Sequence, residues 1–68
     1  MNVVVEVHFI SNENKVMQRE SFPLRRQKPE RVALDFWKQI KREMPFGAEL
    51  SKLLIDGEDK TEVIKEME

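Results

Sequence analysis

The stretch from residue 29 to residue 44 constrains the fold of this 68-residue chain more than any other part of it. Apolar side chains recur there at every fourth position, so that one face of a helix would be apolar. The recurring residues are Val32, Phe36, Ile40 and Met44. Pro29 suits the first helical turn, and Pro45 ends the helix because the residue before a proline is disfavoured in the α region. The pattern predicts a helix over residues 29–44 whose apolar stripe the rest of the chain must cover.

The segment from Met1 to Ile10 is rich in β-branched residues, which predicts a strand. Its odd-numbered side chains form a fully apolar face and its even-numbered side chains form a mixed face. The apolar face consists of Val3, Val5, Val7 and Phe9, and the mixed face of Val4, Glu6, His8 and Ile10. Polar residues 11–14 predict a hairpin turn. Residues 16–24 then predict a return strand at a sheet edge, because Pro23 cannot donate a ladder hydrogen bond.

Residues 50–55 form a short apolar run that predicts a third strand, and Asp56-Gly57 is a strong turn signal. Residues 60–68 have two interpretations. As a strand they would place Thr61 and Val63 on one face. As a helix they would be capped by Asp59 and would present an apolar stripe of Val63, Ile64 and Met67. We prefer the strand, because so short a helix is marginal alone whereas a strand can join an existing sheet.

The predicted order of elements is strand, strand, helix, strand, strand, with one helix packed on one face of a mostly antiparallel sheet. This α+β order resembles the two-layer β-grasp (ubiquitin-like) ββαββ fold over the whole chain. The resemblance implies that the first strand is central, which suits its fully apolar face. We expect a single small domain spanning residues 1–68.

The composition argues against an enzyme. There is no cysteine and only one histidine, so neither a disulfide nor a histidine–cysteine metal site is expected. His8 is interpreted as a surface histidine beside Glu6 and not as a catalytic base. The only glycines, Gly47 and Gly57, do not form a phosphate-binding loop. We predict no catalytic residue, no cofactor-binding residue, no metal ligand and no cofactor.

Charge and hydropathy also limit the partners. The formal net charge is −1, which gives no strong overall attraction to nucleic acid or anionic lipid. No run approaches the roughly 20 apolar residues of a membrane span, and the N-terminus lacks the basic region of a secretory signal. We therefore expect a cytoplasmic protein that does not bind membranes.

Two surface features are candidate binding sites. On the predicted helix, Trp37 lies at the margin of the apolar stripe and Leu34 beyond it, and exposed apolar residues beside lysines are typical of an interaction patch. This hypothetical partner-binding patch consists of Leu34, Trp37, Lys38 and Lys41. The alternative interpretation is that a loop covers the apolar pair. The second feature is a basic cluster at the helix start, made of Arg25, Arg26, Lys28 and Arg31.

The favoured function is a small non-enzymatic protein–protein interaction module, such as a regulator or inhibitor of a larger intracellular protein. Its partner would be another protein, or a second copy of the chain that covers the outer sheet face around Val4 and Ile10. A free sheet edge is a further candidate contact, through strand addition. The less favoured alternative is a nucleic-acid-associated protein that binds phosphates through the basic cluster, which has no interleaved aromatic residues to stack bases.

Overall fold

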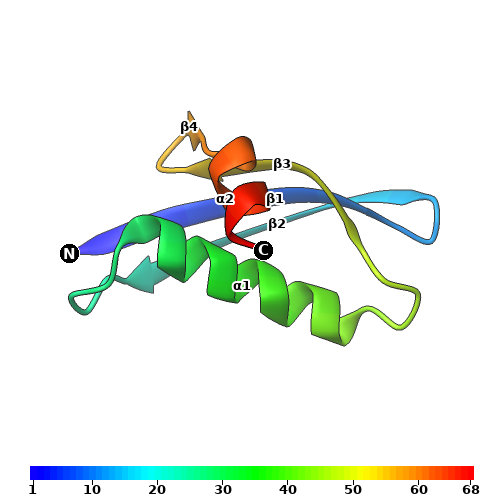
Figure 1. The fold of residues 1–68 in the computed structure, drawn as a ribbon, viewed down its shortest axis with the longest axis horizontal. Helices are drawn as coiled ribbons and strands as arrows, with labels where there is room; N and C mark the ends of the chain where they lie inside the picture. Colours follow the sequence, from blue (N-terminus) through cyan, green and yellow to red (C-terminus); the bar gives the residue numbers. More distant parts are fainter.

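The computed structural model describes all residues from 1 to 68 and consists of an open four-stranded sheet and two helices (Figure 1). The strands are β1 (Asn2–Ser11), β2 (Asn14–Pro23), β3 (Glu49–Ile55) and β4 (Glu58–Asp59), and the helices are α1 (Pro29–Glu43) and α2 (Thr61–Met67). The strand order is β2-β1-β3-β4, and every neighbouring pair is antiparallel. β2 and β3 therefore run in the same direction on either side of β1, and α1 connects them by crossing the sheet.

The predicted α+β class and the interior position of the first strand are confirmed. The finer ββαββ β-grasp topology is not confirmed. The last strand, β4, has only two residues, and the chain continues into α2 instead of into a longer strand. The part of the sheet formed by β3 and β4 is therefore smaller than the resemblance to the β-grasp fold implied.

The hydrophobic core lies between α1 and one face of the sheet. Val3, Val5, Val7 and Phe9 are each exposed by 1% or less, which confirms the predicted face of the first strand. The helix predicted over residues 29–44 is present, with Met44 as its C-cap. Its buried residues are Val32, Ala33, Leu34, Phe36, Trp37 and Ile40.

The Leu34 and Trp37 side chains are covered, as in the alternative interpretation, and the exposure that the partner-binding patch requires is not observed. They are 2% and 1% exposed, respectively. The cause is α2, which packs against both α1 and β3 and widens the buried stripe on that side of α1. Trp37 stacks at a tilt on Phe9, with ring centroids 5.8 Å apart, and its Nε1 donates a hydrogen bond to Glu68 Oε1 at 2.6 Å. Trp37 is therefore part of the core.

The preference for a strand over residues 60–68 is also wrong, because the segment forms α2. The Thr61 hydroxyl accepts the backbone N–H of Leu53 at 2.9 Å, which ends the ladder after β4. Asp59 Oδ1 in turn accepts hydrogen bonds from the backbone N–H and the hydroxyl of Thr61, at 2.9 and 2.6 Å. Of the helical stripe considered for this segment, Ile64 is fully buried, whereas Val63 and Met67 are each 39% exposed. Packing of Ile64 supplies the stability that so short a helix lacks alone.

A β-bulge in β3 determines which side chains reach the open face of the sheet. The pairing of β1 with β3 shifts between His8 and Phe9, which leaves Ser51 without a partner. Leu50 and Leu53 can then both be buried although they are three positions apart. Ser51 and Lys52 are consequently both exposed.

Candidate functional site

The face of the sheet opposite α1 is the candidate functional site, and we call it the outer face. It carries the even-numbered side chains of β1 and their register partners on β2 and β3. Its residues are Val4, Glu6, His8 and Ile10 of β1, Lys15, Met17, Arg19 and Ser21 of β2, and Glu49, Lys52 and Leu54 of β3. None of them is buried. The two helices are packed on the other side of the sheet, so the outer face has no covering layer within this chain (Figure 1).

A hydrogen-bonded pair of side chains occupies the centre of the outer face. His8 Nε2 lies 2.7 Å from Glu6 Oε2, and both side chains are about one-third exposed. The hydrogen bond from His8 lowers the pKa of Glu6 below its usual value of 4.5, partial burial opposes the shift, and the charges of His8, Arg19 and Lys52 add to it. Glu6 is therefore a carboxylate at neutral pH whose charge is already compensated by its neighbours.

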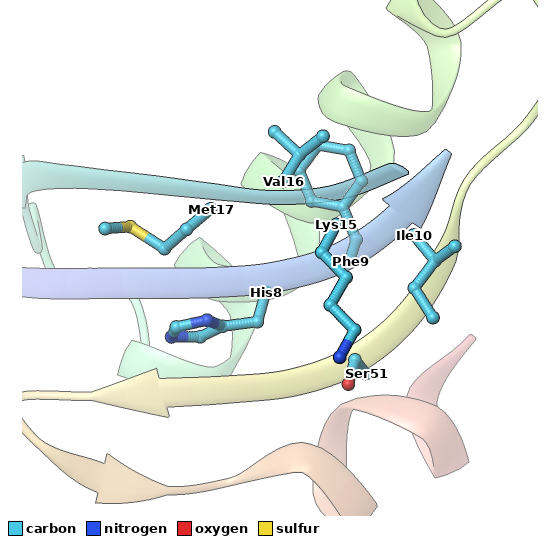
Figure 2. Close-up of a pocket in the computed structure, with 7 residues that line it drawn as sticks. All are labelled: His8, Phe9, Ile10, Lys15, Val16, Met17 and Ser51. Carbon is cyan, nitrogen blue, oxygen red and sulfur yellow. The ribbon is translucent and has the colours of Figure 1, made fainter. Parts of the chain in front are cut away.

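Two shallow hollows lie on either side of this pair. The first, of about 210 Å³, is lined by His8, Phe9, Ile10, Lys15, Val16, Met17 and Ser51 (Figure 2). The second, of about 290 Å³, is lined by Val4, Glu6, Arg19, Leu54, Asp56 and Gly57. Sites that enclose a small molecule commonly measure about 300–1,000 Å³ and are mostly apolar. Open hollows of this size and mixed lining suit individual side chains of a protein partner better than a buried cofactor.

The outer face does not assemble a recognisable catalytic group. His8 Nε2 is engaged by Glu6, and no hydrogen bond joins His8 to Ser51, the serine in the same hollow. The hydroxyl of Ser11 donates instead to the carbonyl of Gly47, at 2.9 Å. The structure contains no group of three or more histidine or carboxylate side chains arranged to hold a metal ion.

The edge of the sheet at β2 adjoins the outer face. The backbone N–H and C=O of Val4 both bond to Asp56, so even-numbered residues of β1 direct these groups toward β3. Odd-numbered residues of β1 therefore bond to β2. It follows that the β2 residues paired with even-numbered partners direct their backbone groups away from the sheet. These residues are Lys15, Met17, Arg19 and Ser21.

The structure does not bring the predicted partner-binding patch together as a surface. Leu34 and Trp37 are buried, and Lys38 is exposed. Lys41 Nζ lies 2.6 Å from Glu68 Oε1 and 5.6 Å from the centre of the Trp37 ring. Lys41 therefore helps to hold the end of the chain against α1. Its hydrogen bond, with a smaller contribution from the Trp37 N–H, lowers the pKa of Glu68 below 4.5 against the opposing effect of burial.

The predicted basic cluster lies at the start of α1, and all four of its side chains are exposed. Arg25 and Arg26 both have left-handed backbone angles, with φ of 47° and 67°, in the turn that leads to the helix. Arg31 Nε is 3.5 Å from Asp35 Oδ1. The other members, Arg25, Arg26 and Lys28, make no ion pair.

Sequence reasoning identified the mixed face of the first strand but missed its neighbours on β2 and β3. The parity of Met17, Arg19 and Ser21 was readable in the sequence, but the register that sets them beside His8 and Glu6 was not. Glu49 was missed because the bulge at Ser51 changes the face of the residues before it, so that Leu50 turns inward and Glu49 outward. A bulge leaves only a weak signal, here two leucines with the wrong spacing for an alternating strand.

No protein-family model, curated protein or solved structure matches this chain. Neither α1 nor α2 combines the length and the apolar character that a membrane-crossing helix requires.

Proposed function

We propose that the protein is a small non-enzymatic binding module that regulates or inhibits a larger protein inside the cell. The contact surface is the outer face of the sheet together with the β2 edge. The single observation that carries this proposal is that the outer face displays apolar side chains around the hydrogen-bonded pair of Glu6 and His8 without any covering layer.

The composition of the outer face supports a protein partner. Ile10 and Met17 are 36% and 53% exposed, and Val4 and Leu54 are half-buried. Protein interfaces combine such apolar side chains with polar groups at their rim. Polar anchors are present, because the hydrogen-bonded pair of Glu6 and His8 lies between the apolar positions.

The proposal is tested by affinity capture from the source cell with three forms of the tagged protein: wild type, Met17→Glu and Met67→Glu. Both methionines are exposed, but Met67 lies on α2, away from the outer face. We expect Met17→Glu to lose a partner that wild type and Met67→Glu both retain in stoichiometric amount. Equal capture by all three forms would show that the outer face is not the contact surface. Light scattering on the same variants distinguishes a second copy of the chain from a different protein.

A nucleic-acid ligand is the second proposal, and it is favoured by one observation. Arg25, Arg26 and Lys28 are exposed at one end of the molecule without a carboxylate partner. Such free cations bind phosphates in a strongly salt-dependent way. Charge reversal of Arg25 and Arg26 is expected to abolish binding of a labelled oligonucleotide at low salt, and absence of a complex with the wild-type protein at low salt disposes of this proposal.

A further inference from the structure

We infer that the protein binds an extended, acidic segment of its partner as an additional antiparallel strand at the β2 edge. The inference rests on the proposed function and specifies the chemistry that the interface recognises. It is carried by the free backbone groups of β2, by cations on one side of this strand and by a hollow on its other side. We call the side chains of β2 on the outer face its outer row (Lys15, Met17, Arg19 and Ser21), and those on the opposite face its inner row (Val16, Gln18, Glu20 and Phe22).

The backbone of β2 offers a long free edge. β2 spans Asn14–Pro23 and is the terminal strand of the sheet, with β1 as its only neighbour. The N–H and C=O groups of Lys15, Met17, Arg19 and Ser21 point away from β1, as derived above. An added strand that bonds to them is expected to be antiparallel, because every existing pair in the sheet is antiparallel. Pro23 has no N–H, which limits the pairing at that end.

The outer row of β2 selects acidic residues. Lys15 and Arg19 are exposed on this row, and neither makes an ion pair. The carboxylate opposite Arg19 belongs to Glu6, which is already bonded to His8. Met17, at 53% exposure, lies between the two cations on the same row. Directly opposite residues of neighbouring strands contact one another, so a complementary segment has a carboxylate, an apolar side chain and a second carboxylate at alternate positions.

The inner row of β2 selects against acidic residues. Glu20 is exposed on this row and would repel a carboxylate placed opposite it. A hollow of about 330 Å³ lies between β2 and α1 beside Phe22. Its apolar part is formed by Phe22, Val32 and Phe36, and its polar part by Arg25, Gln27, Asp35 and Gln39. The rings of Phe22 and Phe36 are 4.9 Å apart between centroids. An apolar side chain opposite Phe22 would contact the apolar part of this hollow.

Together the two rows define a segment whose acidic residues all face one side. This requirement distinguishes a peptide strand from a nucleic acid, whose phosphates do not alternate between two faces with backbone donors between them. The outer face also has no phenylalanine, tyrosine or tryptophan on which an unpaired base would stack.

The test uses an eight-residue, end-capped fluorescent peptide designed to pair antiparallel with residues 15–22. Its first position is leucine, opposite Phe22, its third is lysine, opposite Glu20, and its fourth is glutamate, opposite Arg19. Its sixth position is valine, opposite Met17, and its eighth is glutamate, opposite Lys15. Threonine or valine occupies the remaining positions, which are the second, fifth and seventh. Binding is measured by fluorescence anisotropy, and its location by the amide NMR signals of β2.

Two control peptides separate strand addition from simple charge attraction. The first is N-methylated at its fourth and sixth positions, whose N–H groups would face β2, and it keeps every side chain. The second exchanges the lysine and the glutamate at the third and fourth positions and keeps the composition. We expect each control to bind at least about tenfold more weakly than the parent peptide. Binding of the N-methylated peptide at parental strength would overturn the inference.

Two protein variants test the outer row. Arg19→Glu is expected to weaken binding about tenfold, the factor expected for one charge-assisted contact. Arg42→Glu makes the same change of charge on α1, away from the outer face, and is expected to leave the affinity unchanged. Equal weakening by both variants would indicate non-specific attraction and would also overturn the inference.

Failure of the inference is distinguishable from failure of the proposed function. Partner capture that depends on Met17, without binding of the parent peptide, overturns strand addition and leaves the outer face as the contact surface. Peptide binding that shifts the β2 amides, without Met17-dependent capture, supports strand addition and overturns the broader role of the outer face.

Discussion

The two faces of β1 belong to one strand and differ in the burial of their side chains. The odd-numbered side chains from Val3 to Phe9 are buried to 1% or less, and they are all apolar. The even-numbered side chains from Val4 to Ile10 remain partly exposed, and they include the hydrogen-bonded pair of Glu6 and His8. The difference teaches that this chain builds its stability on one side of the sheet only. The other side contributes little to the core, and the proposed contact surface lies there.

Leu53 and Leu54 offer the largest test of this comparison, because they are adjacent residues on β3 that point to opposite faces. Leu53 is fully buried, whereas Leu54 is half-buried on the outer face. We expect Leu53→Ala to lower the free energy of unfolding by about 2–5 kcal/mol, since it leaves a cavity in the core. We expect Leu54→Ala to lower it by about 1 kcal/mol or less. Urea denaturation followed by far-UV circular dichroism measures both values.

A chain of this size has a total stability of only about 3–5 kcal/mol. Leu53→Ala is therefore expected to be largely unfolded at 37 °C. Equal effects of the two substitutions would contradict the one-sided core, and it would then be necessary to look for a layer that covers the outer face.

The second-largest expected effect concerns α2, which packs on the covered side of the sheet and contributes to the stability of the fold. Ile64 is fully buried against the core, and its neighbour Val63 is 39% exposed. Because α2 is too short to be stable alone, we expect Ile64→Ala to release it at a cost of about 2 kcal/mol or more. Val63→Ala is the matched control and is expected to cost less than about 0.5 kcal/mol.

Trp37 reports directly on α2, because it is the only tryptophan and its Nε1 bonds to Glu68. Release of α2 is expected to move the tryptophan emission to longer wavelength as the ring becomes hydrated. An unchanged emission spectrum in a folded Ile64→Ala protein would show that α2 does not protect the ring.

The comparison of faces also explains which parts of the fold could be predicted from the sequence. The odd-numbered face of β1 and the helix over residues 29–44 were predictable, because their hydrophobic periods of 2 and close to 3.6 are strong and unbroken. The hairpin was predictable because its turn residues are polar, and in the structure Asn12 and Glu13 both have positive φ, at 52° and 66°.

The predictions that failed depend on contacts between distant segments. Residues 60–68 do not continue the sheet, because the Thr61 hydroxyl accepts a hydrogen bond from the backbone N–H of Leu53, eight residues earlier. The burial of Leu34 and Trp37 followed from that outcome, because the resulting helix covers their side of α1. Helical periodicity alone placed Trp37 at a margin and could not indicate that a second helix would extend the core there. The sheet register, which assembles the outer face, has no local sequence signal either.

The smallest expected effect is a pH dependence that also separates the two sides of the sheet. Glu68, on the covered side, has a pKa lowered by its hydrogen bonds from Lys41 and Trp37, and Glu6, on the outer face, has a pKa lowered by His8. A carboxyl group whose pKa is lower in the folded state stabilises that state fully above its usual pKa of 4.5. That contribution is lost as the pH falls through the lower, folded-state pKa.

The measurement is tryptophan emission between pH 7 and pH 2 for the wild type, Glu68→Gln and Glu6→Gln. Glu68→Gln is expected to remove part of the acid-induced change in Trp37 emission, at a cost near neutral pH of about 1 kcal/mol or less, as for a partly exposed ion pair. Glu6→Gln is expected to leave unchanged the emission change that precedes global unfolding, because Glu6 lies on the opposite side of the sheet from Trp37. Equal loss of the acid-induced change in both variants would mean that the faces are coupled, and that protonation on the outer face reaches the core.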